Sequence, residues 1–312
     1  MITFDSKTVD SAGAFLVGEL ERLDKQLHMP LVQVTWNRDI DLREDVTIAD
    51  EASSFTNTSL AAMGSLSPGG KNWVGPKANA LAGISLDTNK TAQNMNLWAM
   101  QLGWTIQELA KASILGRPID SQQTEALRLK HNMDVDEQVY IGDEDLGLTG
   151  LVNNANITPE GLAAEWDETT TAKQMLSDVN DILSQAYARS GYTLCPDRML
   201  IPPTKLGLLT QPVSDAGSIS ILKYVAENCL CNSINGRPLQ ILPLKWLVGR
   251  GTSGKNRVVT YTKNKTYVRF PMVPLQRTPV EFRGLHQLTT YFGTIGSVEF
   301  VYPETVSYAD GL

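Results

Sequence analysis

Apolar side chains near the N-terminus recur at helical spacing. The segment AGAFLVGELERLDKQL has an apolar residue every three to four positions, and the turn at Pro30 ends the pattern. Residues 31–36 (LVQVTW) then alternate weakly, and no helical period follows as far as residue 49. This predicts a helix followed by an extended arm with short strands. The apolar positions of the helix are Phe15, Leu16, Leu20, Leu23 and Leu27.

Residues 51–93 lack any sustained period. Ser, Thr, Asn, Gly and Ala dominate this stretch, with SLSPGGKNWVGPK at its centre. A segment of this length without structure is uncommon inside a compact domain, so it is either functional or an excursion from the fold. Its sparse apolar side chains cannot build a core of their own and need a further surface, which a neighbouring subunit could supply. They include Phe55, Leu60, Leu66, Trp73 and Val74.

The next segment, NLWAMQLGWTIQELAKASILGRP, is rich in helix formers until Pro118 interrupts it. A helical projection places Trp98, Leu102, Ile106 and Leu109 on one face, with further apolar residues on another. This predicts a helix packed from two sides. A second helix, over about 121–132, continues it after a cap at Asp120.

The second half of the chain mixes helical and alternating patterns after the glycine-rich GLTGLVNNANI. A helix is predicted over 172–189, a strand in RMLIPP, and further helices from about Thr204 and over 218–228. Strands are predicted in four further segments: LQILPLKWL, RVVTYT, TYVRFPM and SVEFVYP. The fold class predicted is therefore α+β.

Composition narrows the class of protein. A chain of 312 residues has room for about two domains. The net charge of −7 is opposite to the basic footprint of a protein that reads nucleic-acid sequence. The chain has no apolar run of about 18 residues and no signal-peptide pattern, so we expect no membrane span and folding in the cytoplasm. The odd number of cysteines predicts buried thiols at Cys195, Cys229 and Cys231 rather than disulfides.

One stretch, GRGTSGKN (249–256), nearly matches the phosphate-binding pattern G-x-x-x-x-G-K-[ST]. Asn256 stands where the magnesium-binding hydroxyl is required, and a β-branched run follows instead of a helix. We therefore expect a hairpin turn with Arg250, Lys255 and Arg257 as exposed charges. An NTP-binding enzyme is the least favoured alternative.

Other patterns of catalytic chemistry are weak. Ser220 and Lys223 match S-x-x-K without the motifs that accompany it in enzymes, and the three histidines are widely separated. The acidic residues over 134–145 break the calcium-loop pattern. We predict no enzyme, no catalytic residue, no cofactor and no metal site.

Four segments resemble, in order, those of one protein family. GWTIQELAKASILGRPID is similar to its spine-helix segment, and Gly142-Asp143 followed by GLTGLVNN is similar to the turn that ends it. PDRMLIPPTKLGLL resembles its strand, double proline and helix, and YPETVSYADG its closing motif. The family is the major capsid proteins of tailed bacteriophages with the Hong Kong 97-like fold, which encapsulin shells share. The matching residues are Gly103, Trp104, Glu108, Leu109, Gly116, Gly142, Asp143, Gly147, Leu148, Gly150, Leu151, Asn153, Tyr308, Asp310 and Gly311.

This resemblance implies a division of the chain. The expected parts are an N-terminal arm (1–45), an extended loop (46–95), a peripheral domain with the spine helix (96–155 and 265–312) and an axial domain (156–264). The extended loop would be a long hairpin laid over the adjacent subunit. Some relatives crosslink a loop lysine to a neighbour's asparagine, but nothing here identifies a partner, so no crosslink is predicted. The implied contact residues are Phe55, Leu60, Leu66, Lys71, Trp73, Val74 and Lys77.

The implied function is structural. Copies of the chain would assemble as pentamers and hexamers into an icosahedral head that encloses double-stranded DNA without reading its sequence. The implied partners are the chain itself and, as further candidates, separate scaffolding, portal and cement proteins. The protein would lie in the virion after assembly in the host cytoplasm. The alternative is an encapsulin-like compartment, which would hold cargo proteins instead of DNA.

Overall fold

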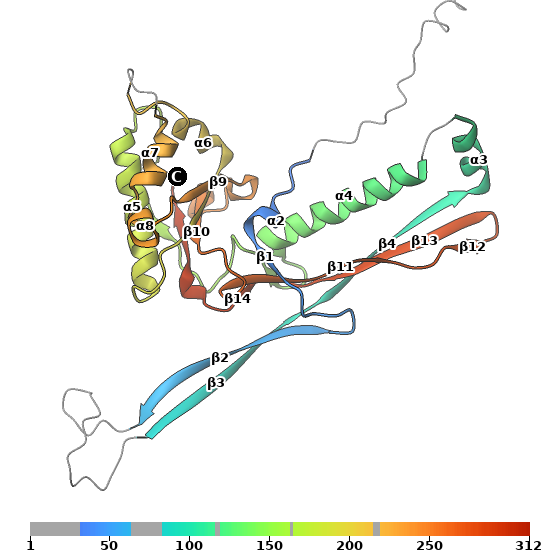
Figure 1. The fold of residues 1–312 in the computed structure, drawn as a ribbon, viewed down its shortest axis with the longest axis horizontal. Helices are drawn as coiled ribbons and strands as arrows, with labels where there is room; N and C mark the ends of the chain where they lie inside the picture. The colour runs from blue at the N-terminus through green and yellow to red at the C-terminus, as the bar shows by residue number, and fades with distance from the viewer. Residues whose placement is uncertain (1–31, 64–82, 116–118, 163–164, 215–218) are drawn as a thin grey trace, which may run out of the picture.

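The computed structural model describes residues 32–63, 83–115, 119–162, 165–214 and 219–312 (Figure 1). The expected N-terminal helix and Gly116 lie outside these residues, as do Leu66, Lys71, Trp73, Val74 and Lys77. The described chain is elongated, with two large sheets and one two-stranded sheet in its body and a two-stranded ribbon that projects from it (Figure 1). None of the helices in these ranges is long and apolar enough to cross a membrane.

A six-stranded sheet forms the long side of the body. Its strand order is β1-β11-β13-β12, while β14 pairs with β11 and β4 with β13. Strands β4 and β13 are antiparallel neighbours along their full length. The bounds are β1 (Asp41–Arg43), β4 (Asn96–Thr105), β11 (Val268–Arg277), β12 (Glu281–Arg283), β13 (His286–Ile295) and β14 (Glu299–Phe300).

The helix predicted for 96–118 is wrong in its first half. Residues 96–105 are strand β4, and only Ile106–Leu115 form a helix, α3. The apolar side chains of β4 also fit a period of two: Trp98 and Trp104 lie on the better buried face, whereas Leu97 is exposed. Pairing with the distant strand β13 decides between the two periods.

The long helix of the fold is α4 (Ile119–Tyr140), which lies along the sheet and is longer than predicted (Figure 1). Trp98 of β4 packs edge-on against His131 of α4, with ring centroids 4.8 Å apart. The Trp98 indole N–H also donates a hydrogen bond of 3.0 Å to Asp134. These contacts fix the helix on one face of the sheet.

A second sheet of five strands has the order β7-β15-β10-β8-β9. Residues 306–310, which the sequence analysis assigned to the peripheral domain, pair here with β10. Helix α5 (Ala172–Arg189) is confirmed within its predicted bounds and begins with a capping box between Thr171 and Gln174. The strands are β7 (Glu160–Gly161), β8 (Arg198–Ile201), β9 (Gln240–Pro243), β10 (Arg257–Tyr261) and β15 (Val306–Asp310). The remaining helices on this side are α6 (Pro203–Leu209), α7 (Ile221–Asn228) and α8 (Leu230–Asn235).

Two hydrophobic cores lie on opposite faces of this sheet. Met199 and Ile201 point into a core shared with α5 and α7, whereas Leu200 between them points into a core shared with α4 and the six-stranded sheet. This alternation follows from the period of two in strand β8. The five-stranded sheet is therefore the layer that joins the two sides of the body.

The projecting ribbon consists of β2 (Ala52–Met63) and β3 (Gly83–Asn94), paired antiparallel from Ala52 opposite Asn94 to Met63 opposite Gly83. At its base the buried carboxylate of Glu299 accepts hydrogen bonds from Ser53, from Arg43 and from Arg269. This cluster fixes the direction in which the ribbon leaves the body.

The cysteines correct a further expectation. Cys195 and Cys231 form a disulfide with Cα atoms 5.6 Å apart, while Cys229 is a buried free thiol. The two bonded residues are 36 positions apart, and the fold brings the segment before β8 against α8. The parity of the cysteine count carries no information on such a tertiary contact.

Candidate assembly surfaces and the junction that supports them

The turn that follows α4 depends on two glycines. Gly142 has φ +78°, and a Cβ atom there would lie 2.2 Å from the carbonyl oxygen of Leu148. A Cβ atom on Gly150 would lie 2.3 Å from the carbonyl oxygen of Tyr140. The close approach lets β5 (Gly142–Asp143) pair with β6 (Leu148–Thr149). Any side chain at either position would push these backbones apart.

Asn153 closes the same turn. Its amide oxygen accepts from the Gly150 N–H at 2.8 Å, and its amide nitrogen donates to the Ile141 carbonyl at 2.7 Å. The buried Leu151 adds a backbone hydrogen bond to Val139. Residues 150–153 are thereby held against the end of α4. Of the other motif residues, Gly147 adopts φ +67°, and Asp143 accepts from the Asp145 N–H at 3.0 Å.

The C-terminal motif meets this turn. The Tyr308 hydroxyl donates to the Leu151 carbonyl at 2.7 Å, and burial raises the pKa of that hydroxyl. Asp310 accepts two hydrogen bonds from Arg257, of 2.7 and 2.9 Å. Arg257 donates in addition to the Val152 carbonyl at 2.8 Å. One guanidinium thus links the turn after α4 to the C-terminal strand.

Asp310 stays ionised in this position. Burial acts to raise the pKa of its carboxyl, but hydrogen bonds from Arg257 and Thr252 outweigh burial and lower the pKa below the ordinary value of 3.8. Thr252 contributes both its N–H and its hydroxyl, each at 2.8 Å. Gly311, next in the chain, has φ +113°, a conformation that suits glycine.

The GRGTSGKN loop belongs to this junction. The hairpin prediction is wrong, because β9 and β10 on either side of the loop are separated in the sheet by β8. Arg257 is also not an exposed charge, since 11% of its side chain is accessible and it pairs with Asp310. Arg250 and Lys255 are exposed as predicted. Gly251 is required sterically: a Cβ atom there would lie 2.8 Å from the Lys255 carbonyl oxygen.

The first motif lies elsewhere. Gly103 and Trp104 are in β4 and Glu108 and Leu109 in α3, so these residues are not on the long helix as predicted. Glu108 forms a reciprocal cap with Thr105: the Thr105 N–H donates to its carboxylate at 2.9 Å, and the Glu108 N–H donates to the Thr105 hydroxyl at 3.2 Å. The motif therefore marks the change from strand to helix.

Residues 35–39 are held to the body by two buried carboxylates. No sequence motif indicated either of them. Asp136 accepts from the Thr35 and Trp36 N–H groups at 2.7 and 3.0 Å and from the Trp246 indole at 2.8 Å. Asp39, in the short helix α2 (Trp36–Asp39), accepts from Tyr140 and Arg38. Burial and the nearby Asp39 raise the pKa of the Tyr140 hydroxyl. These hydrogen bonds hold residues 35–39 against α4.

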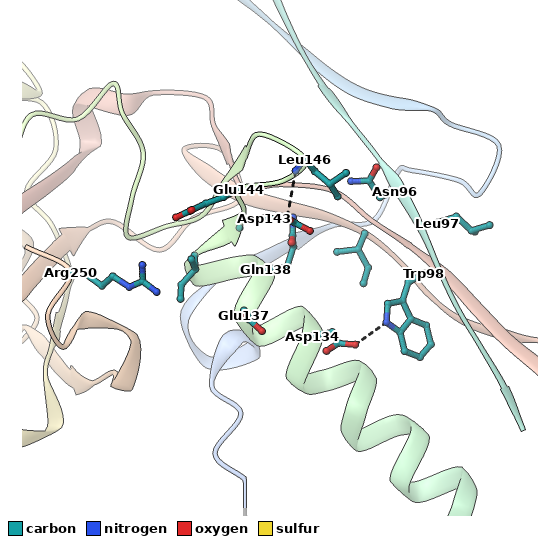
Figure 2. A pocket seen from close by; sticks show the side chains of 13 residues that line it. Asn96, Leu97, Trp98, Asp134, Glu137, Gln138, Asp143, Glu144, Leu146 and Arg250 are labelled. Carbon is teal, nitrogen blue, oxygen red and sulfur yellow. Dashed lines mark hydrogen bonds between the residues drawn. The ribbon is translucent and has the colours of Figure 1, made fainter.

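An acidic pocket of about 610 Å³ lies between the start of β4, the end of α4 and the turn after it (Figure 2). Leu97 and Leu146 on its rim are 66% and 54% exposed. Arg250 is the one basic residue among the described residues that line it. The carboxylates that line the pocket belong to Asp134, Glu137, Asp143 and Glu144. The pocket offers negative charge beside apolar surface.

Apolar side chains are also exposed at the extremities of the molecule. On the ribbon, Ile84 and Leu86 are 68% and 65% exposed. At the opposite end, Ile114, Phe282 and Leu285 are 85%, 74% and 71% exposed. Such surface is typical of contacts with other macromolecules. Of the predicted contact residues, Phe55 is half-buried near the base of the ribbon and Leu60 lies in β2; the other five fall outside the described ranges.

A metal site is not evident in the part of the chain that the structure describes, because no three His, Cys, Asp or Glu residues there are grouped closely enough to hold an ion. The geometry thus consists of a rigid junction and several exposed surfaces.

Comparisons with known proteins agree with this architecture. The family model described as Major capsid protein matches residues 69–312.

The capsid of Myoviridae Phage XM1 is 16% identical with a TM-score of 0.75, covering 95% of this chain and 98% of that one. The capsid of a native GTA particle is 10% identical with a TM-score of 0.63, and 99% of both chains is covered. The holo-SrpI encapsulin complex from Synechococcus elongatus PCC 7942 is 13% identical with a TM-score of 0.50, covering 99% of this chain and 96% of that one. No curated protein matches by sequence. The structural likenesses establish the Hong Kong 97-like fold.

Proposed function

The chain belongs to the major capsid protein family, and we propose that its copies assemble as pentamers and hexamers into an icosahedral shell around double-stranded DNA. The observation that carries this proposal is the elongated subunit with exposed apolar side chains at both ends. A protein that functioned as a monomer would expose this surface at the expense of solubility. Repeated around a closed shell, contacts of moderate area stabilise the whole particle.

The proposal includes the division of the chain into the parts that the resemblance implies. In this proposal 1–45 is the N-terminal arm, 46–95 is the loop between subunits, 96–155 with 265–312 is the peripheral domain, and 156–264 is the axial domain. Because the ribbon leaves the body, its exposed side chains, such as Ile84 and Leu86, are available to a neighbouring copy. Phe55 and Leu60 would contact that copy at the ribbon, and the residues from Leu66 to Lys77 would do so beyond it.

We assign the acidic pocket as the surface that receives the neighbour's loop. Residues 64–82 contain Lys71 and Lys77 but no Asp or Glu, and they also carry Trp73 and Val74. The pocket combines four carboxylates with the exposed Leu97 and Leu146. Opposite charges that meet at an interface set its register and specificity, while apolar burial supplies affinity.

A charge-swap experiment tests this assignment. Glu144→Lys and Lys71→Glu are each expected to reduce the yield of closed particles, and the double variant is expected to restore much of it. Glu168→Lys, which reverses an exposed carboxylate outside the pocket, serves as the control. Particle yield is measured by sedimentation and electron microscopy. If the double variant is as defective as the sum of the single ones, the two residues do not meet.

The content of the particle separates a phage head from an encapsulin-like compartment, to which the fold is also similar. We favour DNA, because the similarity to the XM1 phage capsid is higher, with a TM-score of 0.75 against 0.50. The acidic chain suits a wall that contacts DNA only weakly. Nuclease-protected double-stranded DNA in purified particles would support the head. A co-purifying cargo protein without DNA would support the compartment.

Assembly in the host cytoplasm with separate scaffolding, portal and cement proteins completes the proposal. Expression of this chain alone tests the need for scaffolding. Aberrant tubes or shells of mixed size are expected. Uniform shells of the size found in virions would show that no separate scaffolding protein is needed.

A further inference from the structure

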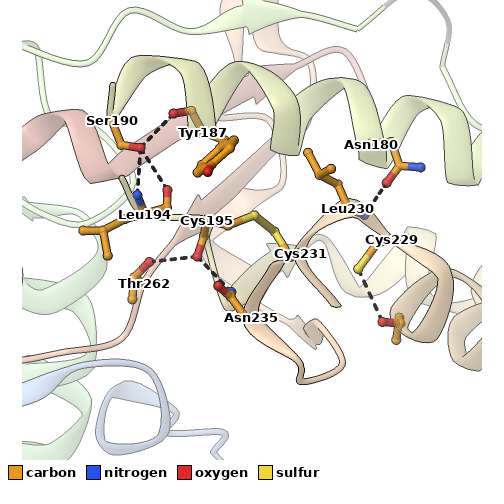
Figure 3. Close-up of a disulfide and its surroundings, with 11 residues drawn as sticks. Asn180, Tyr187, Ser190, Leu194, Cys195, Cys229, Leu230, Cys231, Asn235 and Thr262 are labelled. Atoms are coloured by element: carbon orange, nitrogen blue, oxygen red, sulfur yellow. Dashed lines mark hydrogen bonds between the residues drawn. A yellow bond between two sulfur atoms is a disulfide. The ribbon is translucent and has the colours of Figure 1, made fainter. Parts of the chain in front are cut away.

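Three cysteines lie on the helical side of the five-stranded sheet (Figure 3). Cys195 precedes β8, Cys231 lies in α8, and Cys229 is the N-cap residue directly before α8. All three are buried, with at most 3% of the residue exposed. Cys195 and Cys231 are bonded, and their Cα separation of 5.6 Å is ordinary for a disulfide.

The remaining sulfur does not compete for this bond. The Cys229 thiol donates to the Ala226 carbonyl at 3.4 Å, and Figure 3 shows it directed toward that carbonyl and away from the disulfide. The pairing of Cys195 with Cys231 is thus specified.

Hydrogen bonds without sulfur position the two bonded residues. The Asn235 side chain donates to the Cys195 carbonyl at 3.1 Å, and the Leu194 N–H donates to the Ser190 hydroxyl at 3.1 Å. At the start of α8, the Leu230 N–H donates to Asn180 of α5 at 2.8 Å. None of these hydrogen bonds involves a sulfur atom, so reduction of the disulfide removes none of their donors or acceptors. The folded subunit therefore keeps the two cysteines adjacent in either oxidation state.

We propose that Cys195 and Cys231 are an oxidation site: they are thiols in the newly folded subunit and become a disulfide when the protein meets an oxidant of the small-disulfide class. One cysteine thiolate attacks the small disulfide and releases one small thiol. The other cysteine thiolate then attacks the mixed disulfide and releases the second small thiol. Two electrons pass from the cysteines to the oxidant, and their two protons end on the released thiols. This inference does not depend on shell formation.

The disulfide would act as a covalent crosslink within the helical core. It links two positions 36 residues apart, and β8, α6 and α7 lie between them. A crosslink of this kind stabilises mainly by restricting the unfolded chain. The oxidised subunit should therefore withstand heating better than the reduced one, by roughly 5 °C or more. A shell assembled from reduced subunits would gain this stability on leaving a reducing compartment.

Thiol counting and thermal unfolding of the full chain test the proposal. The chain purified under reductant is divided, and one half is treated with oxidised glutathione. Both halves are then denatured in the presence of iodoacetamide, which alkylates free thiols. Mass spectrometry should find one alkylated cysteine, Cys229, in the oxidised half and three alkylated cysteines in the reduced half. The oxidised half should also unfold at the higher temperature. Cys229→Ser should keep this difference, whereas Cys195→Ser and Cys231→Ser should abolish it.

Two outcomes would overturn the proposal. One is the alkylation of three cysteines in the oxidised half, or a bond that involves Cys229. The other is an equal unfolding temperature for both halves of the wild-type chain. The wild-type comparison remains decisive if a serine variant fails to fold, and neither readout requires particles, so a failure of shell assembly is recorded separately.

Discussion

At the scale of single residues, the Arg257–Asp310 pair joins three segments that are far apart in the sequence. The pair lies largely out of water, with 11% and 6% of the two side chains exposed. Removal of one charge from such a pair leaves the other buried without a partner, which costs about 3 kcal/mol or more. Asp310→Asn should lower the free energy of unfolding by about this amount, as measured by urea unfolding of the unassembled chain. Glu304→Gln, an exposed carboxylate nearby, should change it by less than about 0.5 kcal/mol.

The same residue gives a pH dependence with a definite sign. Burial is outweighed by hydrogen bonds from Arg257 and Thr252, so the pKa of Asp310 is lower in the folded chain than its ordinary 3.8. Its contribution to stability is then present above about pH 3.8 and is lost as the pH falls through the lowered pKa. The difference in urea midpoint between wild type and Asp310→Asn should thus be constant near neutrality and shrink below pH 4. A difference that stays constant down to pH 2 would contradict this role.

The motif residues of this junction were recognisable from the sequence, but their partners were not. Gly142, Gly150 and Asn153 fall within a short stretch whose turn chemistry is local. Arg257 lies 53 positions from Asp310, and its pairing depends on β10 lying beside β15. The carboxylates of Asp39 and Asp136 are fixed by tertiary contacts of the same kind. The composition of the chain and the spacing of its residues do not indicate which distant residues pair in this way.

At the scale of elements, β4 shows why a local pattern misled and what corrected it. Its apolar residues fit both a period of 3.6 and a period of two, and Leu, Met and Ala favour helices. Ten consecutive pairings with β13 override that preference. By contrast, α5 was predicted within its bounds, because its cap and its buried stripe indicate the same state.

The ribbon β2–β3 supplies an element-scale prediction. Leu86 is 65% exposed, so Leu86→Ser should leave the free energy of unfolding of the isolated chain within about 0.5 kcal/mol. If Leu86 is buried against a neighbour, its loss removes about 1.5–3 kcal/mol per contact. The protein concentration needed for assembly should then rise at least tenfold, which light scattering can follow. Asn89→Ser, at another exposed position of β3, should assemble as wild type. Unimpaired assembly of Leu86→Ser would show that this part of the ribbon makes no such contact.

At the scale of the whole molecule, the five-stranded sheet couples the two hydrophobic cores. Met199 and Leu200 are adjacent, fully buried, and point into different cores. Each substitution by alanine should cost about 2–5 kcal/mol through lost burial and a residual cavity. Because both cores share the sheet, calorimetry of the unassembled chain should show one transition that moves to lower temperature in Met199→Ala and in Leu200→Ala alike. Two separate transitions, each sensitive to only one of the substitutions, would mean that the cores unfold as independent domains. A single transition would mean that the two cores unfold together as one cooperative unit.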